Sequence, residues 1–145
     1  MGRPRQFSEP DAVAAASVVI AHRGFTGTSV DDLVRATGVN RASLYGTFGS
    51  KDGLFRRCLA AALDALDGAS DAQPGTDQRL DDSTIPDRLP SRATALDLVL
   101  VALMELAPDD AVLAADLNER LHRAGVTAVD LGARALERAD AVDPD

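Results

Sequence analysis

The chain is poor in aromatic and sulfur-bearing residues. Its 145 residues include no tryptophan, one tyrosine and one cysteine, and aromatic residues make up 3% of the total. The single cysteine, Cys58, excludes an internal disulfide, and its apolar neighbours predict a small core residue. No stretch of β-branched residues alternates with polar ones, so we expect no sheet. Because alanine and leucine are abundant and favour helix, we predict an all-α fold.

Long apolar runs are also missing. The longest nearly apolar stretch, 98–106, is too short to cross a bilayer, and the N-terminus lacks the apolar run of a signal peptide. We therefore expect no membrane partner and a cytoplasmic location. Patterns for catalysis or metal binding are equally scarce. His22 and His122 are far apart without nearby metal-ligand spacing, and Ser43 has no visible triad partner, so we predict no enzyme, no metal and no cofactor.

The charge is unevenly distributed along the chain. The formal net charge of −8 would by itself argue against a nucleic-acid partner. Residues 1–57, however, hold eight Lys/Arg against five Asp/Glu, a net charge of +3, whereas the remainder has a net charge of −11. Since acidic groups repel a phosphate backbone, any polyanion must meet the N-terminal third of the chain.

The N-terminal part shows four amphipathic helical patterns, each preceded by a capping residue. A glycine follows each of the first three, and the gap between the second and third is about three residues, which is the helix-turn-helix arrangement. We therefore predict a homeodomain-like helix-turn-helix DNA-binding domain over residues 1–66. Its helices are expected to run from the caps Ser8, Ser29, Asn40 and Ser50 to about Arg23, Thr37, Phe48 and Leu66.

The remainder is predicted to form a polar linker, 67–91, and a short helical regulatory or dimerisation region, 92–145. Residues 68–90 are rich in proline, glycine and aspartate, which is typical of exposed linkers. An apolar helix after Ser91 should end at Pro108, and Asp109 or Asp110 should cap the next. That helix should carry a stripe of Val112, Leu113, Leu117 and Leu121 and the ion pairs Asp116–Arg120 and Glu119–Arg123. A break near Gly125 and a continuous helix both remain open.

The third predicted helix carries the chemistry expected of a DNA-reading element. A helix laid end-on into a major groove presents its first turn to base edges. Arg41 can donate two hydrogen bonds to guanine, the Ala42 methyl can contact thymine, and Ser43 can bond to either kind of edge. The groups that suit phosphate are Tyr45, Thr47 and Lys51. Packing of Tyr45 and simple solvation of Arg41, Ser43 and Lys51 are the alternatives.

Residues 24–55, GFTGTSVDDLVRATGVNRASLYGTFGSKDGLF, resemble the helix-turn-helix signature of the tetracycline-repressor (TetR/AcrR) family of transcriptional regulators. The resemblance rests on an ordered set of Gly-aromatic, Thr-Ser, Asp-aliphatic, Gly-Val, Leu-Tyr, Ser-Lys and Leu-Phe matches. It implies that Arg41, Ala42 and Ser43 read bases, and that Thr28, Ser29, Tyr45, Thr47 and Lys51 hold phosphates. The sequence departs from the family pattern at Thr47, where histidine is commoner, and at Val34, where a small alanine is usual.

The N-terminal GRPRQF resembles the arginine-bearing arms that members of this family place in a minor groove. We expect Arg3 and Arg5 to bind there, with a solvated tail as the alternative. The resemblance further implies a homodimeric repressor that binds double-stranded DNA at a palindromic operator and is released by a small-molecule inducer. Two alternatives remain: a shortened partner that heterodimerises with a full-length regulator without binding DNA, and a constitutive repressor without a ligand pocket.

Overall fold

The computed structural model describes residues 8–71 and 90–141, and every regular element within these ranges is a helix. The predicted all-α fold is thus confirmed. Arg3, Arg5 and most of the predicted linker lie outside the described residues. The elements are α1 (Glu9–Arg23), α2 (Val30–Thr37), α3 (Arg41–Phe48), α4 (Lys51–Asp71), α5 (Arg92–Val101), the π-helix η1 (Ala102–Leu106), the 3₁₀ helix η2 (Ala107–Asp109), α6 (Ala111–Arg123) and α7 (Ala128–Asp140).

Local caps set the helix boundaries in the N-terminal part, as the sequence predicts. Ser29 and Asp32 form a capping box, in which the Ser29 hydroxyl accepts from the Asp32 amide at 3.1 Å and the carboxylate accepts from the Ser29 amide at 2.9 Å. Hydrogen bonds to the Asp32 carboxylate from the backbone amide and the side chain of Ser29 lower the pKa of Asp32. Gly38 ends α2 in the left-handed conformation with φ of 71°, which glycine adopts without strain. Asn40 then caps α3.

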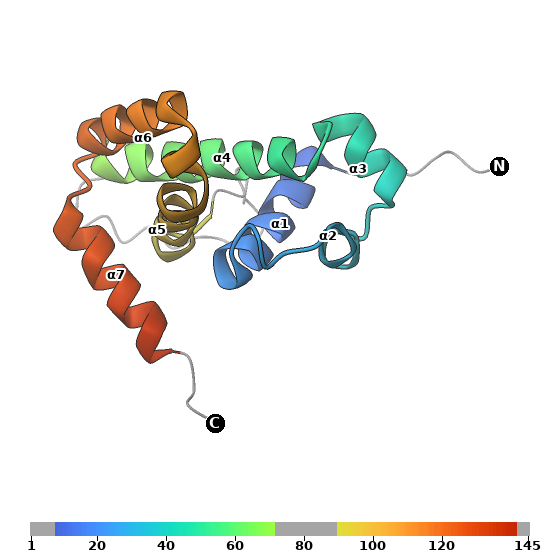
Figure 1. Ribbon diagram of the computed structural model, residues 1–145, viewed down its shortest axis with the longest axis horizontal. Helices are drawn as coiled ribbons and strands as arrows, with labels where there is room; N and C mark the ends of the chain where they lie inside the picture. Colours follow the sequence, from blue (N-terminus) through green and yellow to red (C-terminus); the bar gives the residue numbers. More distant parts are fainter. Residues whose placement is uncertain (1–7, 72–89, 142–145) are drawn as a thin grey trace.

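Helix α4 is the long central helix, with α2 and α3 near one of its ends and α6 and α7 near the other (Figure 1). Its inward face, formed by Phe55, Cys58, Ala62 and Leu66, is completely buried. Burial raises the pKa of the Cys58 thiol to about 11, which fits a core residue rather than a reactive one. One continuous core joins α1 through α6, so helices α2 and α3 share their packing with the C-terminal helices. The helix continues to Asp71, five residues beyond the predicted end at Leu66.

The C-terminal helices agree with the sequence in outline. Helix α5 packs against α4, α1 and α7, which explains why its sequence is apolar on nearly all sides. The helix then loosens into η1, where Met104 is 75% exposed, and Pro108 lies in the 3₁₀ turn that follows. Asp110, rather than Asp109, caps α6. Gly125 adopts φ of 72° between α6 and α7, so the chain breaks there.

Two details of the C-terminal prediction are wrong. Arg120 does not pair with Asp116; its guanidinium instead bonds Asp64 at 2.8 Å and Asp67 at 3.4 Å on α4. Val112 is 81% exposed and does not belong to the buried stripe, whereas Leu113, Leu117 and Leu121 are buried as predicted. The Glu119–Arg123 pair is present at 2.8 Å. Within residues 8–71 and 90–141, no helix has the length and apolar character needed to cross a membrane.

Candidate nucleic-acid interface

Helices α2 and α3 pack across a short turn at the end of the molecule (Figure 1). Leu33 of α2, Val39 of the turn and Leu44 of α3 are buried and fix the angle between the two helices. Leu44 is the one fully buried side chain that α3 contributes. Phe48 at the end of α3 is half-buried and packs against the core, whereas Arg41, Ala42 and Tyr45 are exposed and can face a partner.

The three predicted base-reading residues lie together on the first turn of α3. Arg41 and Ala42 are exposed, and Ser43 is half-buried. The Asn40 side chain accepts from the Ser43 amide at 2.8 Å, which holds this first turn in place. The Arg41 guanidinium forms an ion pair with Asp31 of α2. The turn thus presents a cation, a methyl group and a hydroxyl at the end of the molecule.

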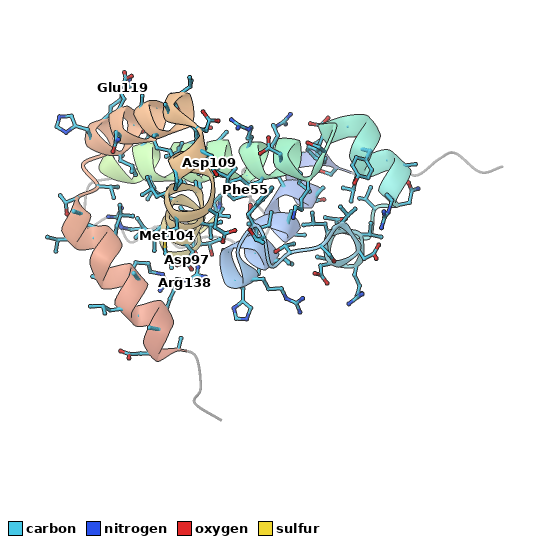
Figure 2. The ribbon with its side chains drawn as sticks, viewed as in Figure 1. Phe55, Asp97, Met104, Asp109, Glu119 and Arg138 are labelled. Atoms are coloured by element: carbon cyan, nitrogen blue, oxygen red, sulfur yellow. The ribbon has the colours of Figure 1, made fainter. Side chains whose placement is uncertain are left out.

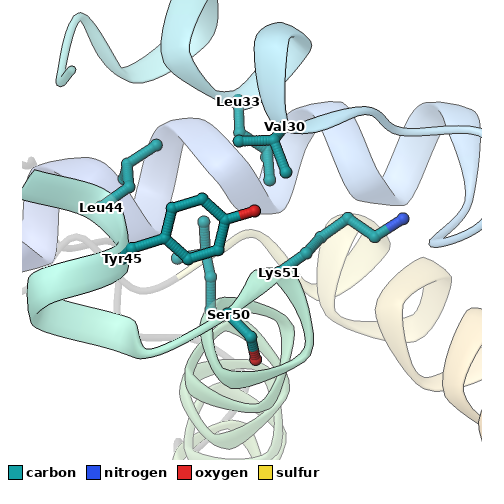
Figure 3. A pocket seen from close by; sticks show the side chains of 7 residues that line it. Val30, Leu33, Leu44, Tyr45, Ser50 and Lys51 are labelled. Carbon is teal, nitrogen blue, oxygen red and sulfur yellow. The ribbon is translucent and has the colours of Figure 1, made fainter. Parts of the chain in front are cut away.

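Tyr45 and Lys51 lie beside a notch between α2, α3 and the start of α4. Figure 3 shows the Tyr45 ring reaching from α3 toward Val30, with the Lys51 side chain extending past it. The notch has an open volume of only about 10 Å³, enough for a single water molecule at most. Tyr45 is 41% exposed, and Thr47 further along α3 is half-buried. The notch is therefore a shallow surface depression, too small to hold a ligand.

Ser29 is exposed at the N-terminus of α2. Its hydroxyl oxygen accepts the capping hydrogen bond from the Asp32 amide, and its side chain also contributes to the lowered pKa of the Asp32 carboxyl. Backbone amides at a helix N-terminus, together with the helix dipole, favour an anion at this position. The geometry of Ser29 therefore suits the phosphate contact that the sequence predicts.

Thr28 is placed differently from the prediction. Its side chain is 1% exposed, and its hydroxyl donates to the Gly24 carbonyl at 2.6 Å. A buried hydroxyl must be hydrogen-bonded internally, and this one closes the turn between α1 and α2. The Thr28 hydroxyl therefore faces the core, and this placement argues against the phosphate contact that the sequence predicts.

Lys51 also serves this turn. Its ammonium donates to the carbonyls of Phe25 and Thr28, both at 3.0 Å, and lies 4.3 Å from the centre of the Phe25 ring. An ammonium group has three donors, so one remains for an outside acceptor. Through these bonds, Lys51 ties the start of α4 to the segment that leads into α2. A phosphate contact would use the remaining donor.

The C-terminal helices reach the same turn through contacts that the sequence does not reveal. The Glu105 carboxylate accepts from the Thr26 amide at 2.7 Å. This contact needs a glycine beside it, because a Cβ at Gly24 would lie 2.5 Å from Glu105 Oε1. Arg138 of α7 donates to the carbonyls of Ala21 and His22 at the end of α1.

Asp97 of α5 forms ion pairs with two arginines of α7, Arg134 and Arg138. Helix α7 packs against α5 at this point (Figure 2). Arg134 makes two hydrogen bonds of 2.8 Å to the Asp97 carboxylate, and Arg138 lies 3.4 Å away. Asp97 is 7% exposed, and its hydrogen bonds raise the pKa of Arg134. The one sequence signal for this network was an isolated acid within an apolar run.

A cleft of about 450 Å³ opens where α1, η1 and α7 meet. Its volume falls within the range of small-molecule sites. Its lining includes Glu105 and Arg138, the two side chains that hold the end of α1 and the turn beyond it. The other lining residues are Arg23, Gly24, Leu100, Val101, Met104 and Ala135.

Within the described part of the chain, no three His, Cys, Asp or Glu side chains lie close enough together to form a metal site.

Comparison with known proteins agrees with this geometry. Residues 12–58, which cover most of α1, all of α2 and α3 and the start of α4, match the model of the tetR family of bacterial regulatory proteins. This part of the chain is therefore similar to the helix-turn-helix domain of the tetR family. The family resemblance predicted from the sequence is thereby confirmed.

The curated proteins that this chain resembles are regulators. It is 47% identical over 58 residues to the HTH-type transcriptional repressor BdcR of Escherichia coli (strain K12), a match that covers 40% of this chain and 29% of BdcR. It is 34% identical over 86 residues to the HTH-type transcriptional repressor ComR of the same organism, covering 59% of this chain and 41% of ComR. The chain thus spans less than half the length of either repressor.

A solved structure matches over a larger share of the chain. It is a cysteine mutant of the TetR family transcriptional regulator CifR, complexed with 26-bp double-strand operator DNA. The match covers 97% of this chain and 91% of that one, with 26% identity and a TM-score of 0.53. The likeness therefore extends beyond the helix-turn-helix into the C-terminal helices.

Proposed function

We propose that this chain is a sequence-specific DNA-binding transcriptional regulator of the tetR family that acts as a repressor. The observation that carries the proposal is the exposed first turn of α3, where Arg41, Ala42 and Ser43 stand together at the tip of the molecule. The named relatives are transcriptional repressors, and the CifR mutant is bound to operator DNA. A cytoplasmic location goes with this partner.

The first turn of α3 enters the major groove in this proposal, and Arg41, Ala42 and Ser43 read base edges. Ser29 at the start of α2 and Tyr45 and Thr47 on α3 bind phosphates on either side. Lys51 holds the α1–α2 turn and offers its remaining donor to the backbone. Arg3 and Arg5 supply the arm for the minor groove.

The regulator binds a palindromic operator as a homodimer in this proposal. Val129 and Leu136 on α7 are 78% and 71% exposed, although both are large and apolar. Seven residues separate them, which places them on one face of the helix. An apolar helix face of this kind supports pairing with a second copy, which would present two reading helices to a symmetric site.

An inducer would bind in the cleft between α1, η1 and α7. The cleft is lined by Glu105, which bonds the α1–α2 turn, and by Arg138, which bonds the last carbonyls of α1. A small molecule that displaced either side chain would release the segment that leads into α2. A constitutive repressor, which the sequence also allows, would bind DNA equally with or without any such molecule.

The alternative is a shortened partner that pairs with a full-length regulator and does not bind DNA. The net charge of −11 after residue 57 favours it, because acidic groups repel a phosphate backbone. Selection of bound sites from random duplex DNA distinguishes the two. Recovery of a palindrome, with affinity that falls steeply with salt as about 6 to 10 phosphates are contacted, supports the regulator. Equal affinity for selected and scrambled DNA contradicts it.

A further inference from the structure

The exposed end of α3 contains an ion pair between two helices. Arg41 Nη2 on α3 donates to Asp31 Oδ1 on α2. Asp31 has no part in the capping box, because its neighbour Asp32 fills that role and also pairs with Arg23 and Arg35. The Asp31 carboxylate is therefore directed at the residue proposed to read guanine.

Stability does not account for this placement. The two side chains are 57% and 71% exposed, and exposed ion pairs contribute little to folding. On a surface that meets phosphates, an exposed carboxylate also weakens binding to every DNA sequence by repulsion. The pair therefore calls for an explanation in terms of recognition.

The geometry leaves Arg41 able to bind a base while it is held. A guanidinium has five N–H donors in one plane, and the bond to Asp31 occupies one of them. A side chain fixed in this way loses less rotamer freedom when it binds than a freely moving arginine does. Two parallel donors in a fixed orientation match the O6 and N7 acceptors of guanine.

We propose that Asp31 is a specificity-determining residue that positions Arg41 for guanine and disfavours sites that lack it. Where guanine is present, its bonds with the oriented guanidinium outweigh the repulsion between Asp31 and the phosphates. Where it is absent, the repulsion remains without that compensation. This inference rests on the proposed DNA-reading function of α3.

The test compares Asp31→Asn with Glu119→Gln in the full chain. Both changes remove one negative charge from an exposed ion pair, but Glu119 pairs with Arg123 on α6, away from α3 (Figure 2). Dissociation constants are measured on the selected site, on the same site with each guanine replaced in turn, and on scrambled DNA. For Asp31→Asn we expect tighter binding to scrambled DNA and a loss of discrimination at one guanine of about 3- to 10-fold. Glu119→Gln should leave that discrimination unchanged.

A double-mutant cycle separates positioning from general charge. In an Arg41→Ala background, Asp31→Asn should still tighten binding to all DNA but should no longer alter the preference for any base. The proposal is overturned if Asp31→Asn leaves discrimination unchanged at every position, or if its effect on one base persists without Arg41. A wild-type chain that does not distinguish its selected site from scrambled DNA overturns the DNA-reading function itself, and this inference with it.

Discussion

The two ends of this molecule are held together by different kinds of contact. The end formed by α2 and α3, which we propose reads DNA, is called the reading end. There, Ser29 and Asn40 each accept a hydrogen bond from the backbone amide three residues ahead, so their helices begin where local chemistry places them. At the other end, α7 is attached through ion pairs between residues far apart in the chain, Arg134 and Arg138 with Asp97. The reading end is thus built locally, whereas the position of α7 depends on a few long-range charges.

The two kinds of contact meet at the turn between α1 and α2. Lys51 of α4 and Glu105 of η1 both bond the backbone of this turn, and Arg138 of α7 bonds the carbonyls just before it. A change at the C-terminal end can therefore reach α2 through side chains, without unfolding the helices that we propose read DNA. The comparison predicts that the two ends respond differently to substitution.

The largest effect on stability is expected for Asp97→Asn. This change leaves Arg134 and Arg138 without their carboxylate, and breaking a largely buried ion pair should lower the free energy of unfolding by about 2 to 4 kcal/mol. Urea unfolding at neutral pH measures the loss. Glu137→Gln is the control, because Glu137 bonds Arg134 at 3.1 Å but is 67% exposed. Equal, small losses for both variants would show that α7 is not anchored by Asp97.

Lys51→Met should have the next largest effect. The substitution keeps the apolar stem but removes two hydrogen bonds and the contact with the Phe25 ring, so we expect a loss of about 2 kcal/mol in the free energy of unfolding. DNA binding should weaken by a similar factor on every sequence, because we propose that Lys51 contacts the phosphate backbone and not a base. Arg123→Met, at an exposed pair on α6, should change neither quantity. A loss confined to one base position would contradict this role.

The proposed dimer face on α7 predicts a change in mass. Val129→Asp combined with Leu136→Asp should convert a dimer to a monomer while leaving the helical circular dichroism intact, because both side chains are exposed. Val112→Asp on α6 is the matched control, being 81% exposed and chemically alike. Sedimentation equilibrium distinguishes the outcomes. A dimer that survives the α7 changes, or a wild-type monomer, would refute the assignment of this face.

Among the stability effects, the smallest is expected at the cap of α2. Ser29→Ala should cost about 1 kcal/mol, as the loss of an N-cap usually does. Hydrogen bonds from Ser29 lower the pKa of Asp32 in the folded chain, so the charged carboxylate stabilises the fold above its ordinary pKa of 3.8. That contribution is lost as the pH falls through the lowered pKa. The stability difference between wild type and Asp32→Asn should therefore shrink in acid, and a constant difference would argue against the capping box.

The same division explains what the sequence could predict. Caps, glycine stops and the order of helices depend on neighbouring residues, and those predictions are confirmed from Ser8 to Gly49. The turn at Thr26 to Ser29 was harder. Thr28 and Ser29 both carry hydroxyls, but the Thr28 hydroxyl points inward because it donates to the Gly24 carbonyl, which residue type alone does not predict.

Ion pairs and hydrogen bonds between residues far apart in the chain could not be predicted from local sequence patterns. The spacing of Asp116 and Arg120 suited an ion pair within α6, but Asp64 and Asp67 of α4 offer Arg120 two carboxylates at once. The contacts of Glu105 with Thr26 and of Arg138 with Ala21 join residues 79 and 117 positions apart. No periodic pattern encodes such contacts, because they depend on how the helices pack.

The proposal that α3 reads DNA is tested most directly by Arg41→Ala. Affinity is measured on the selected site and on variants that change each base pair in turn. The substitution should cost about 1 to 3 kcal/mol on the selected site and remove the preference at one guanine while leaving the other positions unchanged. A uniform loss across all sequences, or no loss, would contradict the reading role of this helix.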